Sequence, residues 1–209
     1  MNTSNVPDKS EVQMLDQAAG KKRDTSKSDR ILQRFRQRNF KSKRKRQEFS
    51  GTWDTTVAEL FPLFCPAREA DWIPGWDSDL IYTDSGLVED NCLFKTDKSN
   101  AAGDGLWMFI GYEVNHYVEF VRIQADIISR GRVTVNDNND GTVSATWNIL
   151  YTGLTEKGNQ EIDKLPEKNP PQADALVKMI DFYLKKGKTI NRASLAAGTL
   201  AGHMGTHLS

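Results

Sequence analysis

The segment Leu63–Trp76 reads LFCPAREADWIPGW. It predicts a short helix followed by a loop that contains two tryptophans. Pro66 suits the first turn of a helix, because its fixed φ matches and its missing N–H would have no partner there. The helix is therefore expected over Ala67–Asp71. Trp72 and Trp76 enclose a loop containing Pro and Gly, a setting in which large aromatic side chains often bind ligands. Packing of this loop against a helix explains the two tryptophans equally well.

The residues before this segment predict a strand and a first short helix. Glu48–Thr55 has the composition of a strand. Thr56 and Glu59 have the spacing of a capping box, in which the threonine hydroxyl accepts a bond from the N3 amide and the glutamate bonds back to the N-cap amide. One strand followed by two short helices is thus expected here.

Segments after Gly75 carry strand signals separated by turns. Thr142–Thr152 alternates apolar and polar residues, which places its larger apolar side chains on one face. Leu106–Val114 is almost continuously apolar, as is typical of a strand covered on both faces. The six expected strands lie at 78–83, 91–96, 106–114, 117–125, 128–136 and 142–152.

A long amphipathic helix is expected between Pro170–Pro171 and Gly187. Thr155–Leu165 is a candidate for an earlier helical segment. These elements predict an α+β protein in the order strand, two short helices, six strands and long helix. The apolar face of the long helix would consist of Ala173, Leu176, Ile180 and Tyr183.

The charge distribution divides the 209 residues into an arm, a body and a tail. The formal net charge is zero, yet residues 21–46 carry 13 Lys/Arg against two Asp. Polar composition predicts disorder for residues 1–29, and a thin apolar stripe suggests a short helix over 30–47. The expected parts are a basic arm at 1–47, a body at 48–187 and a small-residue tail at 188–209.

Composition also disfavours several classes of protein. No apolar run approaches the roughly 20 residues of a membrane span, and no apolar stretch follows the start as in a secretory signal. Two cysteines provide no disulfide framework. A cytoplasmic protein without integral membrane insertion is the expectation.

The basic arm suggests a partner of its own. A net charge of +11 over residues 21–46 would attract nucleic acid or an anionic lipid surface. Phe35 and Phe40 lie among arginines, which suits binding to RNA or to a membrane surface. A solvated basic tail explains the same composition. An adaptor role of the arm is therefore an alternative function.

Four groups of residues form a recognisable pattern. They are Phe61-Pro-Leu63, then Pro66, Glu69, Trp72, Pro74, Gly75 and Trp76, then Phe94-Lys-Thr96, and finally Thr152-Gly-Leu-Thr-Glu-Lys-Gly158. This pattern resembles a bacterial group within the START-like, or SRPBCC, superfamily. The double-tryptophan loop is fairly specific, because so many fixed positions in a short span seldom recur by chance. The resemblance covers about residues 48–187 and does not extend to the arm or the tail.

This resemblance implies a helix-grip fold, in which a curved antiparallel sheet of about seven strands wraps a long C-terminal helix and encloses a cavity. Members of the superfamily bind lipids, sterols, polyketides or other apolar molecules, and some are cyclases, aromatases or hydratases. The resemblance therefore implies binding or transport of an apolar or amphipathic molecule. An enzyme acting in the same cavity is the alternative, since a fold does not fix a function. No cofactor is implied.

The candidates for the cavity wall are mostly aromatic. A concave apolar site with a few polar anchors binds small apolar ligands. Burial in a protein core explains the same side chains without any ligand. The candidates are Trp72, Trp76, Phe94, Trp107, Phe109, Trp147 and Tyr151.

Arg68 and Glu69 are the polar candidates for ligand binding. An arginine can bind a carboxylate or phosphate through two parallel hydrogen bonds. A structural role competes with this interpretation. In that case Glu69 caps the start of the helix and Arg68 pairs with a neighbouring carboxylate.

Catalytic and metal-binding signals are weak. Cys65 would need a nearby base, and no motif places a histidine beside it. His203 and His207 have helical metal-ligand spacing but no third ligand nearby, so no metal is expected. Glu119 flanks a predicted hairpin and is expected to face solvent. The candidates for acids in an enzymatic cavity are Tyr112, Tyr117 and Tyr151, and a buried polar constellation around Glu69, Tyr112 or Tyr151 would favour an enzyme.

Overall fold

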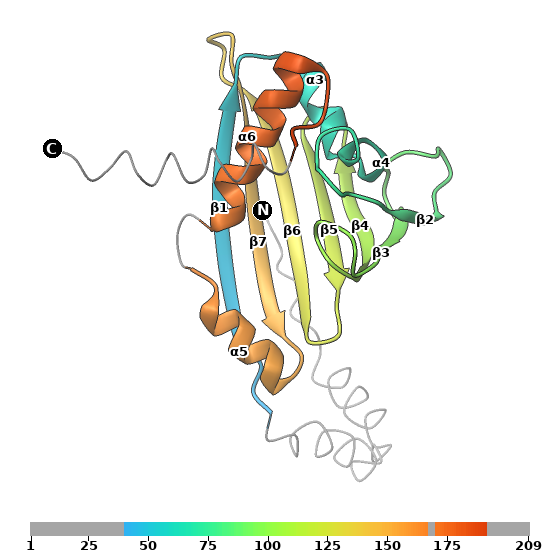
Figure 1. The fold of residues 1–209 in the computed structure, drawn as a ribbon, viewed down its shortest axis with the longest axis vertical. Coiled ribbons are helices and arrows are strands. Elements are labelled where there is room, and N and C mark those ends of the chain that lie inside the picture. Colours follow the sequence, from blue (N-terminus) through green and yellow to red (C-terminus); the bar gives the residue numbers. More distant parts are fainter. Residues whose placement is uncertain (1–39, 167–169, 192–209) are drawn as a thin grey trace, which may run out of the picture. The chain divides into compact units, whose positions relative to one another are not determined.

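The computed structural model describes residues 40–166 and 170–191 of the chain. Their elements belong to the second of two compact units, which begins at Ser42. Seven antiparallel strands form one sheet in the order β1-β7-β6-β5-β4-β3-β2 (Figure 1). The strands are β1 (Arg44–Trp53), β2 (Asp79–Tyr82), β3 (Leu93–Thr96), β4 (Gly105–Glu113), β5 (Tyr117–Ile123), β6 (Ile127–Asp137) and β7 (Val143–Gly153).

Helical segments cover one face of this sheet. Three short ones follow β1 in close succession, and the 16-residue helix α6 lies across the sheet (Figure 1). The predicted helix-grip fold is confirmed, with its two short helices after the first strand and a 3-10 turn between them. The segments are α3 (Val57–Leu60), η1 (Phe61–Phe64), α4 (Pro66–Glu69), α5 (Glu156–Lys164) and α6 (Pro171–Lys186).

The local signals that bound these helices act as predicted. Thr56 and Glu59 form the capping box at the start of α3. Pro66 occupies the first turn of α4. Helix α6 ends at Gly187, whose φ of 63° lies in the left-handed region that glycine adopts without strain. These caps fix where the chain enters and leaves each helix.

The start of β1 corrects the expectation for the basic segment. A helix was expected over residues 30–47, of which residues 30–39 lie outside the described residues. Residues 44–47 are extended and pair with β7, from Arg44 opposite Thr152 to Gln47 opposite Ile149. Strand β1 lies at the edge of the sheet, and its exposed charged side chains, Arg44, Arg46 and Glu48, discourage edge-to-edge association.

The face of the sheet away from the helices corrects two further expectations. Strand β4 was expected to be covered on both faces, but Leu106 and Met108 are each 39% exposed, while Trp107 and Phe109 are buried. Glu119 was expected to face solvent, but it is buried between Arg130 and Arg132, which bond to its carboxylate at 2.7 Å each. Burial alone would raise the pKa of Glu119, but these arginine hydrogen bonds outweigh it and lower the pKa.

The core lies between the concave face of the sheet and the helices. Alternation in β7 buries Val143, Ala145 and Trp147. The α6 face meets them with buried Ala173 and Ile180, as the sequence predicts. This packing stabilises the shell that surrounds the cavity described next.

Candidate functional site

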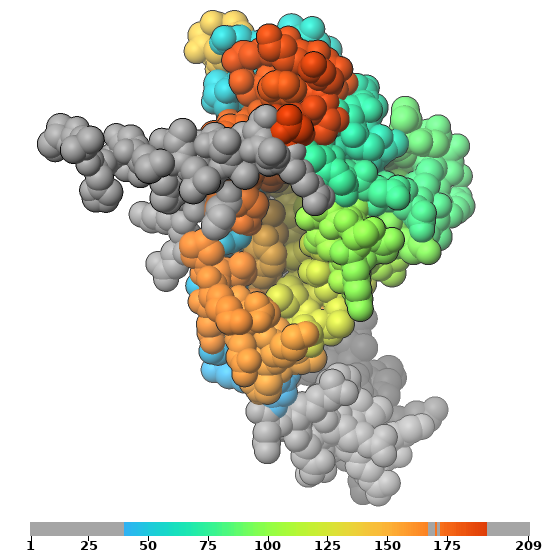
Figure 2. Space-filling model, viewed as in Figure 1, coloured from blue at the N-terminus to red at the C-terminus, as the bar shows by residue number. Residues whose placement is uncertain are grey.

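A cavity of about 410 Å³ lies between the concave face of the sheet and α6. Figure 2 shows the surface hollowed between the orange-red helices and the green segments of the chain. Its wall is predominantly apolar, with contributions from α4, the loop after α4, five strands and α6. A volume of this size suits a small organic molecule.

Aromatic rings form one wall of the cavity. Phe94 and Trp107 stack with centroids 5.5 Å apart, and Trp76 meets Trp107 edge-on at 6.1 Å. The indole N–H of Trp107 donates to Thr96 at 3.0 Å, which fixes the ring plane. All seven candidates named for the wall do line it: Trp72, Trp76, Phe94, Trp107, Phe109, Trp147 and Tyr151.

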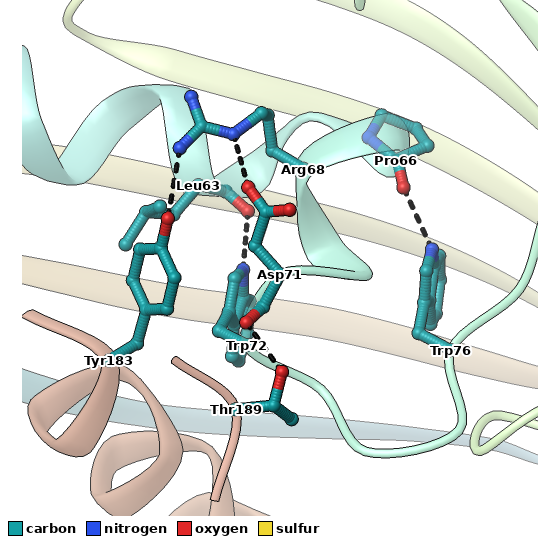
Figure 3. Close-up of polar contacts among 8 residues, drawn as sticks. All are labelled: Leu63, Pro66, Arg68, Asp71, Trp72, Trp76, Tyr183 and Thr189. Carbon is teal, nitrogen blue, oxygen red and sulfur yellow. Dashed lines mark hydrogen bonds and ion pairs between the residues drawn. The ribbon is translucent and has the colours of Figure 1, made fainter. Parts of the chain in front are cut away.

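Hydrogen bonds hold both tryptophans of the loop in place (Figure 3). The Trp72 indole donates to the Leu63 carbonyl at 2.8 Å, and the Trp76 indole donates to the Pro66 carbonyl at 2.8 Å. Trp72 is almost fully buried, whereas Trp76 is half-buried. Trp76 therefore combines a fixed position with exposure, so it is the ring best placed to border the entrance.

A glycine under Phe120 sets the depth of the cavity. Phe120 and Gly131 are paired across β5 and β6. A Cβ at Gly131 would overlap the phenyl ring, lying 2.8 Å from Cε2. The missing side chain lets the tip of the Phe120 ring occupy the space over Gly131, so less of the ring projects into the cavity.

Arg68 does not line the cavity. Its Nε bonds to the Asp71 carboxylate at 2.6 Å, and its Nη2 donates to the Tyr183 hydroxyl at 3.2 Å (Figure 3). Both contacts raise the pKa of Arg68. The guanidinium thus joins α4 to the last turns of α6, which is the structural role weighed above for this residue.

Glu69 lines the cavity instead of capping its helix. No side chain caps α4, and the Glu69 carboxyl has no hydrogen-bond or ion-pair partner among the described residues. The carboxyl is partly accessible through the cavity but surrounded by protein. This desolvation raises the pKa of Glu69 to about 8. The group is therefore mostly protonated and uncharged at neutral pH.

Arg122 is a polar wall residue that the sequence analysis missed. Arg122 on β5 is paired directly across from Trp107 on β4, and its guanidinium carbon lies 4.6 Å from the indole centroid. Its Nη2 donates to the carbonyls of Ala102, Gly103 and Asp104. A signal was present in the sequence, because Val118, Phe120 and Arg122 alternate onto one face of a strand whose apolar members face the core.

Tyr151 lies two strands from Arg122 on the same face. Ser129 pairs with both residues, so the three side chains form one row across β5, β6 and β7. Desolvation raises the pKa of Tyr151, and the nearby positive charge of Arg122 acts in the opposite direction. Its hydroxyl has no hydrogen-bond partner among the described residues. The cavity thus has a polar end at this row.

The other catalytic candidates lie elsewhere. Tyr112 packs its ring on Phe61 at 5.7 Å and is not part of the cavity wall. Cys65 is buried, and its sulfur accepts a hydrogen bond from the Val88 amide at 3.3 Å. His116 is exposed on the β4–β5 turn beside Glu113, at 3.1 Å. In the described part of the chain, therefore, no histidine lies beside Cys65 to act as its base.

Several expectations concern residues beyond the described ranges. The basic arm up to residue 39, with its suggested nucleic-acid or anionic-lipid partner, lies outside them, as do His203 and His207. Within the described ranges, no cluster of three His, Cys, Asp or Glu side chains is arranged to hold a metal ion. No helix in these ranges has the length and apolar character needed to cross a membrane.

No protein-family model matches the chain, and no curated protein matches its sequence. Solved structures do resemble it. Norcoclaurine synthase from Thalictrum flavum, as a point mutant in complex with a transition-state analogue, aligns with a TM-score of 0.52 and 10% identity over 71% of this chain and 99% of that one. Protein MLL2253 from Mesorhizobium loti aligns with a TM-score of 0.50 and 11% identity over 68% of this chain and 98% of that one.

DynU16, a protein of the dynemicin biosynthetic locus, aligns with a TM-score of 0.49 and 14% identity over 69% of this chain. The alignment spans only 48% of DynU16, which is less than half of that protein. At these identities the likenesses concern the fold. Together with the sheet order and the position of α6, the likenesses to norcoclaurine synthase and MLL2253 identify the fold as a helix grip.

Proposed function

We propose that this chain, which has a helix-grip fold and motifs that resemble the START-like superfamily, binds a small apolar or amphipathic molecule in the cavity between the sheet and α6. The observation that carries the proposal is the cavity of about 410 Å³ with its wall of aromatic rings. Apolar walls of this kind bind ligands through the surface that they remove from water, at about 25 cal/mol per Å².

The wall is fixed in place before any ligand enters. Trp72, Trp76 and Trp107 each donate an indole N–H to a partner within the protein. A wall fixed in this way does not have to be ordered on binding, which lowers the entropic cost of association. This arrangement favours binding of an apolar molecule over simple filling of a core.

A fluorescence titration with N-phenyl-1-naphthylamine, a neutral apolar probe, tests the proposal. We expect saturable enhancement with the native protein and at least about tenfold weaker binding by Trp76→Ala, because that ring borders the cavity. Absence of saturable binding by the folded native protein would contradict the proposal.

Trp53 provides a matched control for the titration. Its indole also donates to a backbone carbonyl, that of Val177 at 3.2 Å, but Trp53 does not line the cavity. Trp53→Ala should therefore retain probe binding although it removes a more deeply buried ring. Circular dichroism below the unfolding transitions of both variants verifies that they are folded when titrated.

Proton-transfer catalysis in the same cavity is a second candidate function, and Glu69 is the observation that favours it. A carboxyl with a pKa of about 8 and no internal partner can donate a proton at neutral pH and accept it again. Norcoclaurine synthase, which shares the fold, has been solved in complex with dopamine and hydroxybenzaldehyde. An apolar substrate undergoing cyclisation or dehydration would suit such a site.

Catalysis by Glu69 can be tested separately from ligand binding in the same cavity. Native protein incubated with a small-molecule extract should deplete at least one mass in liquid chromatography–mass spectrometry, and Glu69→Gln should leave that mass unchanged while binding the neutral probe normally. Identical extracts after incubation with native protein and with Glu69→Gln would reject catalysis by Glu69 and leave the binding proposal intact.

A further inference from the structure

We propose that the polar end of the cavity, formed by Arg122 and Tyr151, binds the carboxylate of an otherwise apolar ligand, so that the ligand class is an apolar monocarboxylic acid. This inference rests on the proposed function, because it specifies which molecules the same cavity selects.

Arg122 is held rigidly but is not neutralised. Its Nη2 is occupied by three backbone carbonyls of residues 102–104, and its side chain makes no ion pair with a carboxylate in the described part of the chain. Its Nε is buried without a partner, whereas Nη1 has no hydrogen-bond partner there and is not sealed from solvent. Nε is sealed from the cavity, so an anion there would supply the missing acceptor of Nη1.

The surroundings of Arg122 favour a negative partner over continued hydration. Burial lowers the pKa of Arg122, although Tyr151 and Asp104 act in the opposite direction. A guanidinium keeps its proton under these conditions, so the cavity contains a desolvated positive charge. A carboxylate bonded to a charged donor in such a setting forms a short and strong hydrogen bond. The Tyr151 hydroxyl, in the same row, offers a second donor.

The charge count favours a carboxylate over a phosphate. The charged or titratable side chains of the cavity wall are Glu69, Arg122 and Tyr151, and only Arg122 is positive. Arg122 neutralises one negative charge, whereas a phosphate monoester would bring a second charge into an apolar cavity without a partner. Glu69 adds little repulsion at neutral pH, because it is mostly protonated there. The cavity is thus suited to a monoanion.

Displacement of N-phenyl-1-naphthylamine tests this inference with three competitors of equal ring size. They are 1-naphthaleneacetic acid, the neutral 2-(1-naphthyl)ethanol and 1-naphthyl phosphate. At pH 7 we expect the acid to bind at least about tenfold more tightly than the alcohol. The phosphate should bind more weakly than the acid. Phosphate binding more tightly than the acid would overturn the assignment of a carboxylate.

Arg122→Gln should abolish the preference for the acid and leave the affinity for the alcohol within about twofold. Arg130→Gln is the matched control, since Arg130 lies on the neighbouring strand but bonds to Glu119 on the opposite face. It should leave the preference unchanged. Equal affinities of native protein for acid and alcohol would reject the carboxylate and keep the proposed function, whereas no binding of the neutral probe would reject both.

Arg122→Gln removes the bonds of Arg122 to residues 102–104, so a second variant, Tyr151→Phe, keeps the test sound if Arg122→Gln fails to fold. Tyr151→Phe keeps the ring and removes only the hydroxyl. We expect it to weaken binding of the acid by about threefold to tenfold without changing that of the alcohol. An unchanged acid-to-alcohol ratio in Tyr151→Phe would remove Tyr151 from the proposed anion site.

Discussion

The guanidinium of Arg68 donates to the hydroxyl of Tyr183 at 3.2 Å while its Nε bonds to Asp71 at 2.6 Å. Nearby, Thr189 donates to the Asp71 carbonyl at 2.7 Å, so the segment after α6 is tied to the same turn (Figure 3). These bonds link the loop that carries Trp72 and Trp76 to the helix that closes the cavity. The residue that resembled a ligand anchor thus serves the architecture of the entrance.

Tyr183→Phe tests this architectural role. The variant removes one hydrogen bond to a charged donor in a half-buried setting, so we expect the free energy of unfolding to fall by about 0.5–1.5 kcal/mol. Urea denaturation measures the change. Tyr117→Phe is the control, because no hydrogen bond of the Tyr117 hydroxyl is found among the described residues, and it should alter stability by less than about 0.5 kcal/mol. Equal effects of the two variants would contradict the role given to Arg68.

Gly131→Ala tests how the depth of the cavity is set. The added methyl group overlaps the Phe120 ring, which must then tilt into the cavity. We expect a loss of stability of about 1–3 kcal/mol and weaker binding of N-phenyl-1-naphthylamine. Combining it with Phe120→Leu should restore part of both quantities, because the smaller side chain leaves room for the methyl group. Failure of the double variant to improve on Gly131→Ala would show that the ring does not transmit the effect.

The buried carboxyl of Glu69 predicts a pH-dependent stability. Its pKa is raised from 4.5 in the unfolded chain to about 8 in the folded protein. Between these values the folded state retains a proton that the unfolded state has lost, so stability falls as pH rises, by at most about 1.4 kcal/mol per pH unit. Below about pH 4.5 both states are protonated and the effect vanishes.

Glu69→Gln isolates this effect, because glutamine resembles the protonated acid. Urea denaturation at pH 5, 6, 7 and 8 should show the variant gaining stability relative to the native protein as pH rises, reaching a few kcal/mol near pH 8. A difference between the two proteins that does not vary with pH would show that Glu69 titrates normally.

The order of the elements could be predicted from sequence because the local signals are strong. The alternation around Trp147 determines which face of β7 is buried, and Thr56 with Glu59 marks a helix start through a bond between near neighbours. Such signals depend on residues a few positions apart. The pairing of Arg44 with Thr152 instead joins residues far apart in the sequence. The polar residues at the start of β1 therefore gave no local strand signal, because long-range hydrogen bonds create this part of the strand.

The candidate site shows the same division. The aromatic wall could be predicted because large rings near Pro and Gly are conspicuous in the sequence, and Trp76 is an example. The roles of Arg68 and Glu69 could not be predicted from the sequence. Adjacent residues on a short helix point in different directions, and only the packed structure decides which of them lines the cavity. Arg122 was detectable from the alternation of β5, but the way its guanidinium is held depends on the fold around residues 102–104.

Native mass spectrometry of freshly purified protein, followed by denaturing extraction, tests the central claim most directly. We predict a reproducible extra mass on the native protein that is retained in Trp53→Ala and lost in Trp76→Ala, with an extracted molecule that is apolar and carries one carboxylate. A protein that shows no extra mass, and that gains none after incubation with a panel of lipids and aromatic acids, would contradict the claim that the cavity is a ligand-binding site.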